Sequence, residues 1–311
     1  THNTFIGDSS GGSTTTGLYN TAVGQSALNA NTTANNNTAV GFSALLSNTT
    51  GTENVAVGPN ALDACTTGSY NIGMGINALG ALTTASFNTG IGTGVMGAIT
   101  TGNHNVGMGY LTLDANTTGT NNTAIGNYAL GANTTADSSV AIGYEALLTN
   151  TTGANNTAVG KTALRSNTTA ANITALGFAA LYANTTGSAN TAVGSNSLAA
   201  NTTGTNNIAL GTAALAANTT GLHNTGLGFN ALNDNTTGGY NTAVGGYALQ
   251  TATTANQNVA LGYAALNLNT TGGNNTALGM SSMPSNTTGD NNTAVGTSAM
   301  SANTTVVIML Q

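Results

Sequence analysis

The sequence has very few charged residues. Lys and Arg together contribute 2 and Asp and Glu together 8 of the 311 residues, a charged fraction of 3%, whereas about 25% is usual for soluble proteins. Without a basic stripe, the chain is not expected to bind nucleic acid. It also has no apolar run of about 18 residues, so no membrane span is predicted. The single cysteine, Cys65, excludes an internal disulfide.

Residues that carry chemistry are equally scarce. His104 and His223 share a position in the repeat described below but lie seven repeats apart, too far to share a metal ion. The acidic residues are scattered, and no two form a pair of the kind that acid–base catalysis needs. Gly92–Gly97 fits G-x-G-x-x-G, but no helix pattern follows, as a dinucleotide site would require. We therefore predict no catalytic, cofactor-binding or metal site, and no enzymatic activity.

What the sequence does contain is one repeated unit of 17 residues. With columns numbered 1 to 17, the unit is N-T-A-V-G-x-x-A-L-x-x-N-T-T-G-x-x, and it occurs 18 times over residues 3–308, without insertions, before a tail at 309–311. A fixed period over the full length is typical of stacked architectures. Seventeen residues are too few for a helical repeat but suit one turn of a β-solenoid with two or three short strands. We predict an all-β, parallel β-solenoid or β-roll of 18 coils, forming a single domain over 1–311.

The columns predict which side chains face inward. Column 4 is always Val, Ile, Leu or Met and column 9 is nearly always Leu or Met, so Val40, Leu45 and their equivalents are expected inside the solenoid. The Thr-Thr pair of columns 13 and 14 predicts a strand with stacked hydroxyls. Column 5 is always glycine, which indicates a corner that needs positive φ or has no room for a Cβ atom. Examples of these corner glycines are Gly24, Gly41, Gly58 and Gly75.

Column 12 predicts a ladder of buried asparagines. It is Asn in most copies, yet its replacements include Cys65, Leu82, Ile99 and Ala252, which a solvent-facing position would not favour. Amide side chains stacked one coil apart can hydrogen-bond to each other. The predicted ladder includes Asn31, Asn48, Asn116, Asn133, Asn150, Asn167, Asn184 and Asn201.

Asparagine also recurs in column 17, where it begins the glycosylation motif Asn-x-Thr. The candidate acceptors are Asn36, Asn121, Asn155, Asn172, Asn274 and Asn291. The Asn-Thr-Thr of column 12 has the same motif, but an inward amide would not be accessible. A structural role and a glycan-carrying role both remain open for these motifs.

So thin a coil buries little apolar surface for each residue it orders. We therefore expect a homo-oligomer, with a trimer favoured, or else a head-to-tail filament. Most aromatic residues fall in the variable columns, as Phe42, Tyr110 and Tyr144 do in column 6. Exposed rings of this kind favour contacts between chains, with a cell-surface glycan or receptor as the alternative partner.

The Asn-Thr-Ala-Val-Gly segments, such as Asn20–Gly24 and Asn156–Gly160, followed by Ala-Leu and Asn-Thr-Thr-Gly, resemble two groups of repeats. One is the head repeat of trimeric autotransporter adhesins. The other, which is closer, is found in tail-fibre and structural proteins of phages. The resemblance implies trimers of left-handed parallel β-rolls that are displayed outside the cell or on a virion and used for attachment.

The sequence thus predicts an extracellular structural and adhesive fibre module that presents a polar surface. A second hypothesis is a subunit of a self-assembling extracellular filament, with or without glycans. A third is an ice-binding solenoid, because the Thr-Thr columns could form a flat hydroxyl array.

Overall fold

The computed structural model of the chain describes residues 2–302 and 304. The predicted tail at 309–311 lies outside the described residues. The described chain divides into two compact units, one ending at Asn155 and the other beginning at Asn156. If the repeats are numbered from the one that begins at Asn3, the first unit contains coils 1–9 and the second contains coils 10–18.

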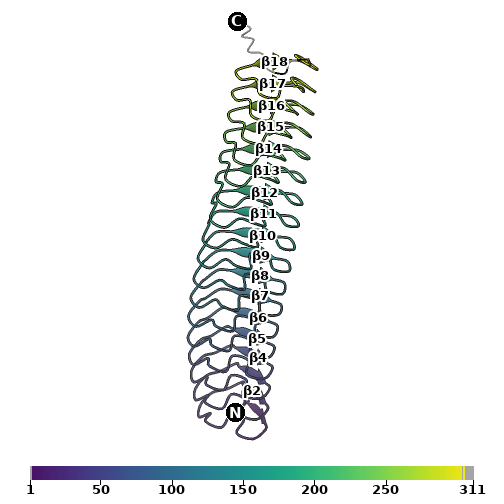
Figure 1. The fold of residues 1–311 in the computed structure, drawn as a ribbon. Coiled ribbons are helices and arrows are strands. Elements are labelled where there is room, and N and C mark those ends of the chain that lie inside the picture. Colours follow the sequence, from purple (N-terminus) through teal and green to yellow (C-terminus); the bar gives the residue numbers. More distant parts are fainter. Residues whose placement is uncertain (1, 303, 305–311) are drawn as a thin grey trace. The chain divides into compact units, whose positions relative to one another are not determined.

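Each coil contributes one strand of three residues, and the strands of each unit are stacked coil upon coil (Figure 1). The strands of the first unit are β1 (Thr4–Ile6), β2 (Thr21–Val23), β3 (Thr38–Val40), β4 (Val55–Val57), β5 (Ile72–Met74), β6 (Thr89–Ile91), β7 (Val106–Met108), β8 (Thr123–Ile125) and β9 (Val140–Ile142). Those of the second unit are β10 (Thr157–Val159), β11 (Thr174–Leu176), β12 (Thr191–Val193), β13 (Ile208–Leu210), β14 (Thr225–Leu227), β15 (Thr242–Val244), β16 (Val259–Leu261), β17 (Thr276–Leu278) and β18 (Thr293–Val295).

Within each unit, neighbouring strands pair in parallel, and each residue pairs with its equivalent 17 positions further on. Thr21 pairs with Thr38 in the first unit, for example, and Thr174 pairs with Thr191 in the second. No helix occurs in the described part of the chain. The predicted all-β parallel solenoid with a 17-residue period is therefore confirmed.

The coil contains fewer strands than predicted. Columns 2–4 form its single strand, whereas the Thr-Thr pair of columns 13 and 14 forms a bend, as at Thr49 and Thr50. The threonines still hydrogen-bond from coil to coil, because the hydroxyl of Thr49 donates to the carbonyl oxygen of Thr66 at 3.1 Å. These hydroxyls thus donate to backbone carbonyls at a bend and do not lie on the face of a second sheet.

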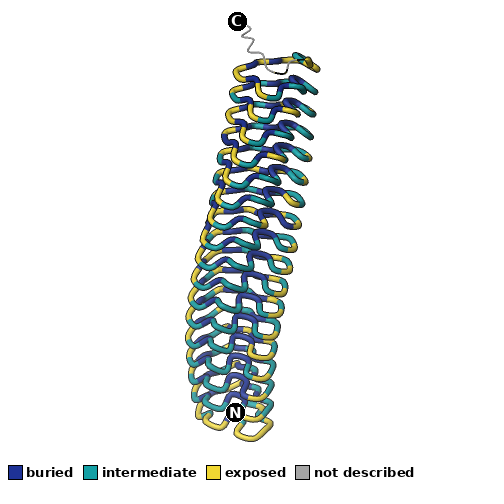
Figure 2. The backbone as a smooth tube through the Cα atoms, viewed as in Figure 1, coloured by how far each residue is buried: buried dark blue, intermediate teal, exposed yellow. Residues whose placement is uncertain are grey.

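The apolar interior contains the alanines of column 8 and, in contact with each other, the small residue of column 3 and the leucine of column 9. Columns 3 and 9 are both fully buried in most coils, as Ala39 and Leu45 are, and buried positions follow the inner side of each coil (Figure 2). The two columns fill one shared space. In coil 1 the sizes are exchanged, so that Phe5 occupies column 3 and Gly11 column 9, and a Cβ atom at Gly11 would lie 2.6 Å from the Phe5 ring.

The prediction that column 4 faces inward is wrong. Val40 is only half-buried, and Met74 and Leu210 have exposed fractions of 37% and 49%. Successive side chains of a strand point to opposite faces. Since column 3 faces the leucines, columns 2 and 4 must both face outward. The small size of column 3 follows, because the Leu side chain already fills the thin interior.

The corner glycines are required by close stacking of the backbone. Gly24 and Gly41 have φ values of 132° and 138°. A Cβ atom on Gly24 would lie 2.5 Å from the carbonyl oxygen of Gly41, and one on Gly41 would lie 2.6 Å from that of Gly58. Gly58 and Gly75 have the same geometry, with φ values of 130° and 135°. Any side chain here would separate adjacent coils.

Candidate interaction surfaces

The outer face of each parallel sheet is formed by columns 2 and 4 and is called here the sheet face. It consists of Thr, Val and Ile in column 2 and Val, Ile, Leu and Met in column 4, so it carries no charge in either unit. Several of its large side chains are substantially exposed, including Met108 in the first unit and Leu176 in the second. Since soluble proteins rarely expose a contiguous apolar strip, the sheet face has the character of an interaction surface.

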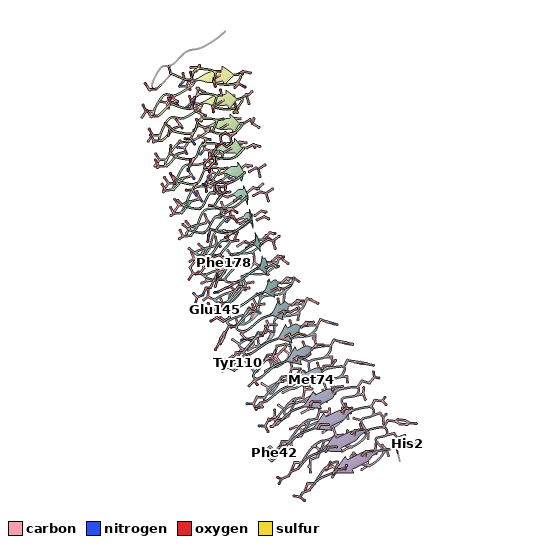
Figure 3. The ribbon with its side chains drawn as sticks, turned by 90° about the vertical axis from the view of Figure 1, so that its right-hand side faces the viewer. His2, Phe42, Met74, Tyr110, Glu145 and Phe178 are labelled. Atoms are coloured by element: carbon pink, nitrogen blue, oxygen red, sulfur yellow. The ribbon has the colours of Figure 1, made fainter. Side chains whose placement is uncertain are left out.

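Aromatic residues line the corners beside the strands. In the first unit, the labelled Phe42 and Tyr110 lie on the opposite side of the strands from His2 (Figure 3). Column 17 holds stacked rings: Tyr70, Phe87 and His104 have successive centroid distances of 4.9 Å and nearly parallel planes. Because stacked rings cover each other's faces, this row presents mainly ring edges to solvent.

Columns 6 and 7 hold rings in a different arrangement. Tyr128 meets Tyr110 and Tyr144 edge to face, with centroid distances of 5.5 and 6.3 Å. The second unit has the same arrangement in the same columns, formed by Phe229, Tyr247 and Tyr263. These two clusters are called here the aromatic triads.

The predicted asparagine ladder of column 12 is present. All eight predicted members are buried. Amide-to-amide bonds join Asn133 to Asn116 and Asn201 to Asn184, the Nδ2 group of the later coil donating to Oδ1 of the earlier one at 2.9 and 2.8 Å. Equivalent bonds join Asn150 to Asn133 and Asn184 to Asn167. Most of the Nδ2 groups in this ladder also donate to the column 15 carbonyl of their own coil, as Asn201 does to Gly204.

The ladder is interrupted at the start. Asn31 donates to the hydroxyl of Thr14, whereas Asn48 donates only to the carbonyl of Gly51, and the Oδ1 atoms of Asn31 and Asn48 accept no hydrogen bond. The coil after Asn48 carries Cys65, whose Sγ atom lies 3.5 Å from the carbonyl oxygen of Gly68. Burial raises the pKa of this thiol to about 11. Cys65 therefore stays protonated at neutral pH and fills space in the ladder.

A second ladder was missed by the sequence analysis. The column 1 asparagines from Asn20 onward are also buried, and the Oδ1 atoms of this column accept the backbone N–H group of the next coil, as between Asn20 and Asn37 at 2.9 Å. Their Nδ2 groups donate to column 15, as from Asn37 to Gly51. The buried Ile173, which replaces Asn in this column, was the available signal for an inward position.

One natural gap in the ladder predicts that a substitution which fills it will stabilise the protein. Asn235 has a buried Oδ1 atom with no donor, because the next coil carries Ala252. In Ala252→Asn, the new amide can donate to Asn235 and accept from Asn269. We expect an increase of about 1–2 kcal/mol in the free energy of unfolding, measured by guanidinium denaturation. Ala252→Leu is the matched control, since it adds apolar bulk without a donor; equal stability of the two variants would contradict the prediction.

The six candidate glycosylation asparagines are all exposed, whereas the asparagines of the column 12 motifs up to Asn286 are buried. All six have a left-handed backbone conformation, with φ between 56° and 60°. Asn tolerates this conformation better than most residues do. The local backbone thus gives a sufficient reason for Asn in column 17, and exposure makes the same side chains geometrically accessible.

The described residues contain no group of three or more His, Cys, Asp or Glu side chains placed to hold a metal ion. Among the same residues, no helix is long and apolar enough to span a membrane. No family model and no curated protein matches the chain. The functional argument therefore depends on the sheet face, the ladders and the corners of the coils.

Proposed function

We propose that this protein is a structural and adhesive fibre module that acts outside the cell or on a virion. In this proposal several copies pack side by side through their sheet faces, and the corners of the coils remain outside for attachment. The observation that carries the proposal is the uncharged sheet face with its row of exposed apolar column 4 side chains, which a chain acting alone would leave in contact with water.

The size of the sheet face supports self-association. Nine strands spaced about 4.8 Å apart and three residues wide give each unit a face of roughly 43 by 10 Å. The faces of the two units together amount to about 800 Å² per chain, the area that a stable interface takes from each partner. Identical uncharged faces also bring no like charges together.

The hydrogen bonding inside each unit suits a mechanical role. Backbone pairing and the column 13 hydroxyls connect successive coils, and the two asparagine ladders add further bonds where Asn is present, as through Asn20, Asn201 and Thr202. A local opening must break several of these contacts together, which favours a stiff, protease-resistant module. The resemblance of the repeat to adhesin heads favours three chains per assembly.

The test is the mass of the assembly in solution. We expect sedimentation equilibrium to give a multiple of the 30.3 kDa chain, with a trimer favoured. The double variant Leu176→Lys/Leu210→Lys places two charges on the sheet face of the second unit. A buried unpaired charge costs several kcal/mol, so we expect this variant to dissociate at concentrations where the unaltered protein is assembled.

The matched control is Thr186→Lys/Thr220→Lys, which adds the same charges to exposed column 14 positions of the same two coils. It should assemble like the unaltered protein, and circular dichroism should show that both variants remain folded. A folded, monomeric unaltered protein would refute assembly through the sheet face. Electron microscopy of the purified protein should show particles of fixed length. Long fibrils would instead favour the filament hypothesis.

A further inference from the structure

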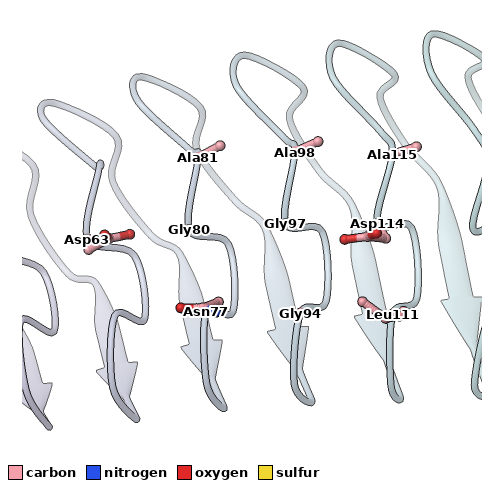
Figure 4. Close-up of a pocket in the computed structure, with 10 residues that line it drawn as sticks. All are labelled: Asp63, Asn77, Gly80, Ala81, Gly94, Gly97, Ala98, Leu111, Asp114 and Ala115. Carbon is pink, nitrogen blue, oxygen red and sulfur yellow. The ribbon is translucent and has the colours of Figure 1, made fainter.

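A groove lies on the surface of the first unit, where column 10 lacks a side chain in two adjacent coils and column 7 lacks one in the second of them. Gly80 and Gly97 occupy column 10 and Gly94 occupies column 7, and together with neighbouring alanines they form the floor (Figure 4). The groove has a volume of about 610 Å³. Column 10 carries larger residues in other coils, such as Leu46 and Leu148. The groove therefore arises from a local run of glycines and not from the repeat itself.

Hydrogen-bond acceptors close both ends of this groove. Asp63 lies at one end and Asp114 at the other, and Asn77 lies on the wall. The two carboxylates lean over the glycines: Oδ1 of Asp63 lies 3.5 Å from the position of a Cβ atom on Gly80, and Oδ1 of Asp114 lies 2.8 Å from that on Gly97. Burial raises the pKa of both aspartates above the ordinary value, opposed in each case by backbone hydrogen bonds.

Aromatic surface begins where the groove ends. Leu111 lines the groove, its neighbour Tyr110 belongs to the aromatic triad, and Tyr128 follows Leu111 in the same column one coil further on. Tyr110 and Tyr144 have exposed fractions of 44% and 45%. A concave site that combines a few polar acceptors with adjacent aromatic rings suits a small molecule that has both hydroxyl groups and apolar faces.

The charges restrict the class of ligand further. The chain up to Asn155 contains no Lys or Arg, so an anionic ligand would find no partner and would be repelled by Asp63 and Asp114. A hard cation such as Ca²⁺ takes six to eight oxygen ligands, roughly, whereas the groove offers two carboxylates at its opposite ends. A neutral polyhydroxyl compound fits both the acceptors and the rings.

We propose that this groove binds a short neutral oligosaccharide, whose hydroxyl groups donate to Asp63, Asp114 and Asn77 and whose apolar ring faces pack against Tyr128. The inference rests on the attachment role proposed above, because it supplies the chemistry of attachment. It does not depend on the number of chains, since every residue involved comes from one unit of one chain.

The experiment is titration of the full chain with cellotriose, maltotriose and triacetylchitotriose, followed by saturation-transfer NMR and calorimetry. We expect at least one trisaccharide to bind. Gly80→Leu should abolish that binding, because the leucine side chain fills the groove. The variant should still fold, since a Cβ atom at Gly80 meets its neighbours only at ordinary contact distances of 3.5 Å or more. Ala199→Leu, in the same column of the second unit, is the control and should bind normally.

A second pair of variants tests the aromatic contact. Tyr128→Ala should weaken binding at least tenfold, whereas Tyr247→Ala, at the matching position of the triad in the second unit, should leave it unchanged. Spermidine, titrated in parallel, serves as a cationic control. If no trisaccharide binds, if Gly80→Leu binds normally, or if spermidine alone binds, the proposal is wrong. A monomeric protein that binds sugar would refute assembly through the sheet face while leaving the groove proposal intact.

Discussion

Gly194→Ala is expected to lower the free energy of unfolding by more than about 4 kcal/mol, within the exceptional range for a single substitution. Gly194 has a φ of 132°, and a Cβ atom there would lie 2.5 and 2.6 Å from the carbonyl oxygen and carbon of Gly211. Both contacts are with backbone, which cannot turn aside as a flexible side chain can. The added methyl group must therefore separate coil 12 from coil 13 and weaken every hydrogen bond between them.

The measurement is guanidinium denaturation followed by circular dichroism. Gly246→Ala is the matched control, since it lies one column later in the same unit and has no positive φ. Its Cβ atom would meet the Tyr263 ring and the carbonyl oxygen of Phe229 only at ordinary distances of 3.5 Å or more. It should shift the denaturation midpoint very little. Similar midpoints for the two variants would mean that coil stacking does not depend on the corner glycines.

Asn201→Leu is expected to cost about 2–4 kcal/mol of unfolding free energy, because it leaves a buried acceptor and a buried donor unpaired. Asn184 would lose its donor, and Asn218 would lose the Oδ1 atom to which it donates at 2.8 Å. The carbonyl of Gly204 would keep a partner, since Asn190 also donates to it. Leucine fits a position of this kind, because Leu82 is fully buried in the same column.

The sharper test is the double variant Asn201→Leu/Asn218→Leu. It again leaves one acceptor unpaired at Asn184 and one N–H group at the other end, now on Asn235, which donates to Asn218 in the unaltered protein. The double variant should therefore cost about as much as the single one, a strong departure from additivity. The free energies of unfolding would be compared through the denaturation midpoints of variants with equal m-values. A loss in the double variant twice that in the single variant would contradict the ladder mechanism.

The same reasoning explains a pattern in the sequence. The apolar replacements Cys65, Leu82 and Ile99 occupy three consecutive coils. A continuous interruption leaves unpaired groups only at its two ends, whereas three separate interruptions would leave them at six. Grouping the replacements therefore limits the number of buried polar atoms without partners.

The period and the ladder could be predicted from the sequence because the 18 copies show which residues each column of the repeat accepts. The lack of insertions required stacking in register, and the mixture of Asn, Cys, Leu and Ile in column 12 required an inward position. The direction of column 4 could not be judged by its apolar character alone. The exchange of sizes between Phe5 and Gly11 was visible, however, and indicates that columns 3 and 9 share the interior.

Two other features needed the structure. The column 9 leucines have positive φ values, 51° at Leu45 and 53° at Leu215. This conformation costs about 1–2 kcal/mol for a residue with a Cβ atom, so a leucine in the sequence does not predict it. Burial of the side chain offsets this cost. The groove depends on columns 7 and 10 lying on one surface, which follows from those turns. Its glycines looked like ordinary variation in the sequence.

Side-chain contacts between coils join residues that are typically 17 or 20 positions apart, as between Asn37 and Asn20, and between Asn233 and Ala213. Among the described residues, a coil thus contacts only its neighbours, and no element there joins coils that are far apart. Removal or duplication of one complete coil would bring together the same pairs of columns that already meet. The length of such a protein can therefore change in evolution in steps of about 4.8 Å, without redesign of any remaining residue.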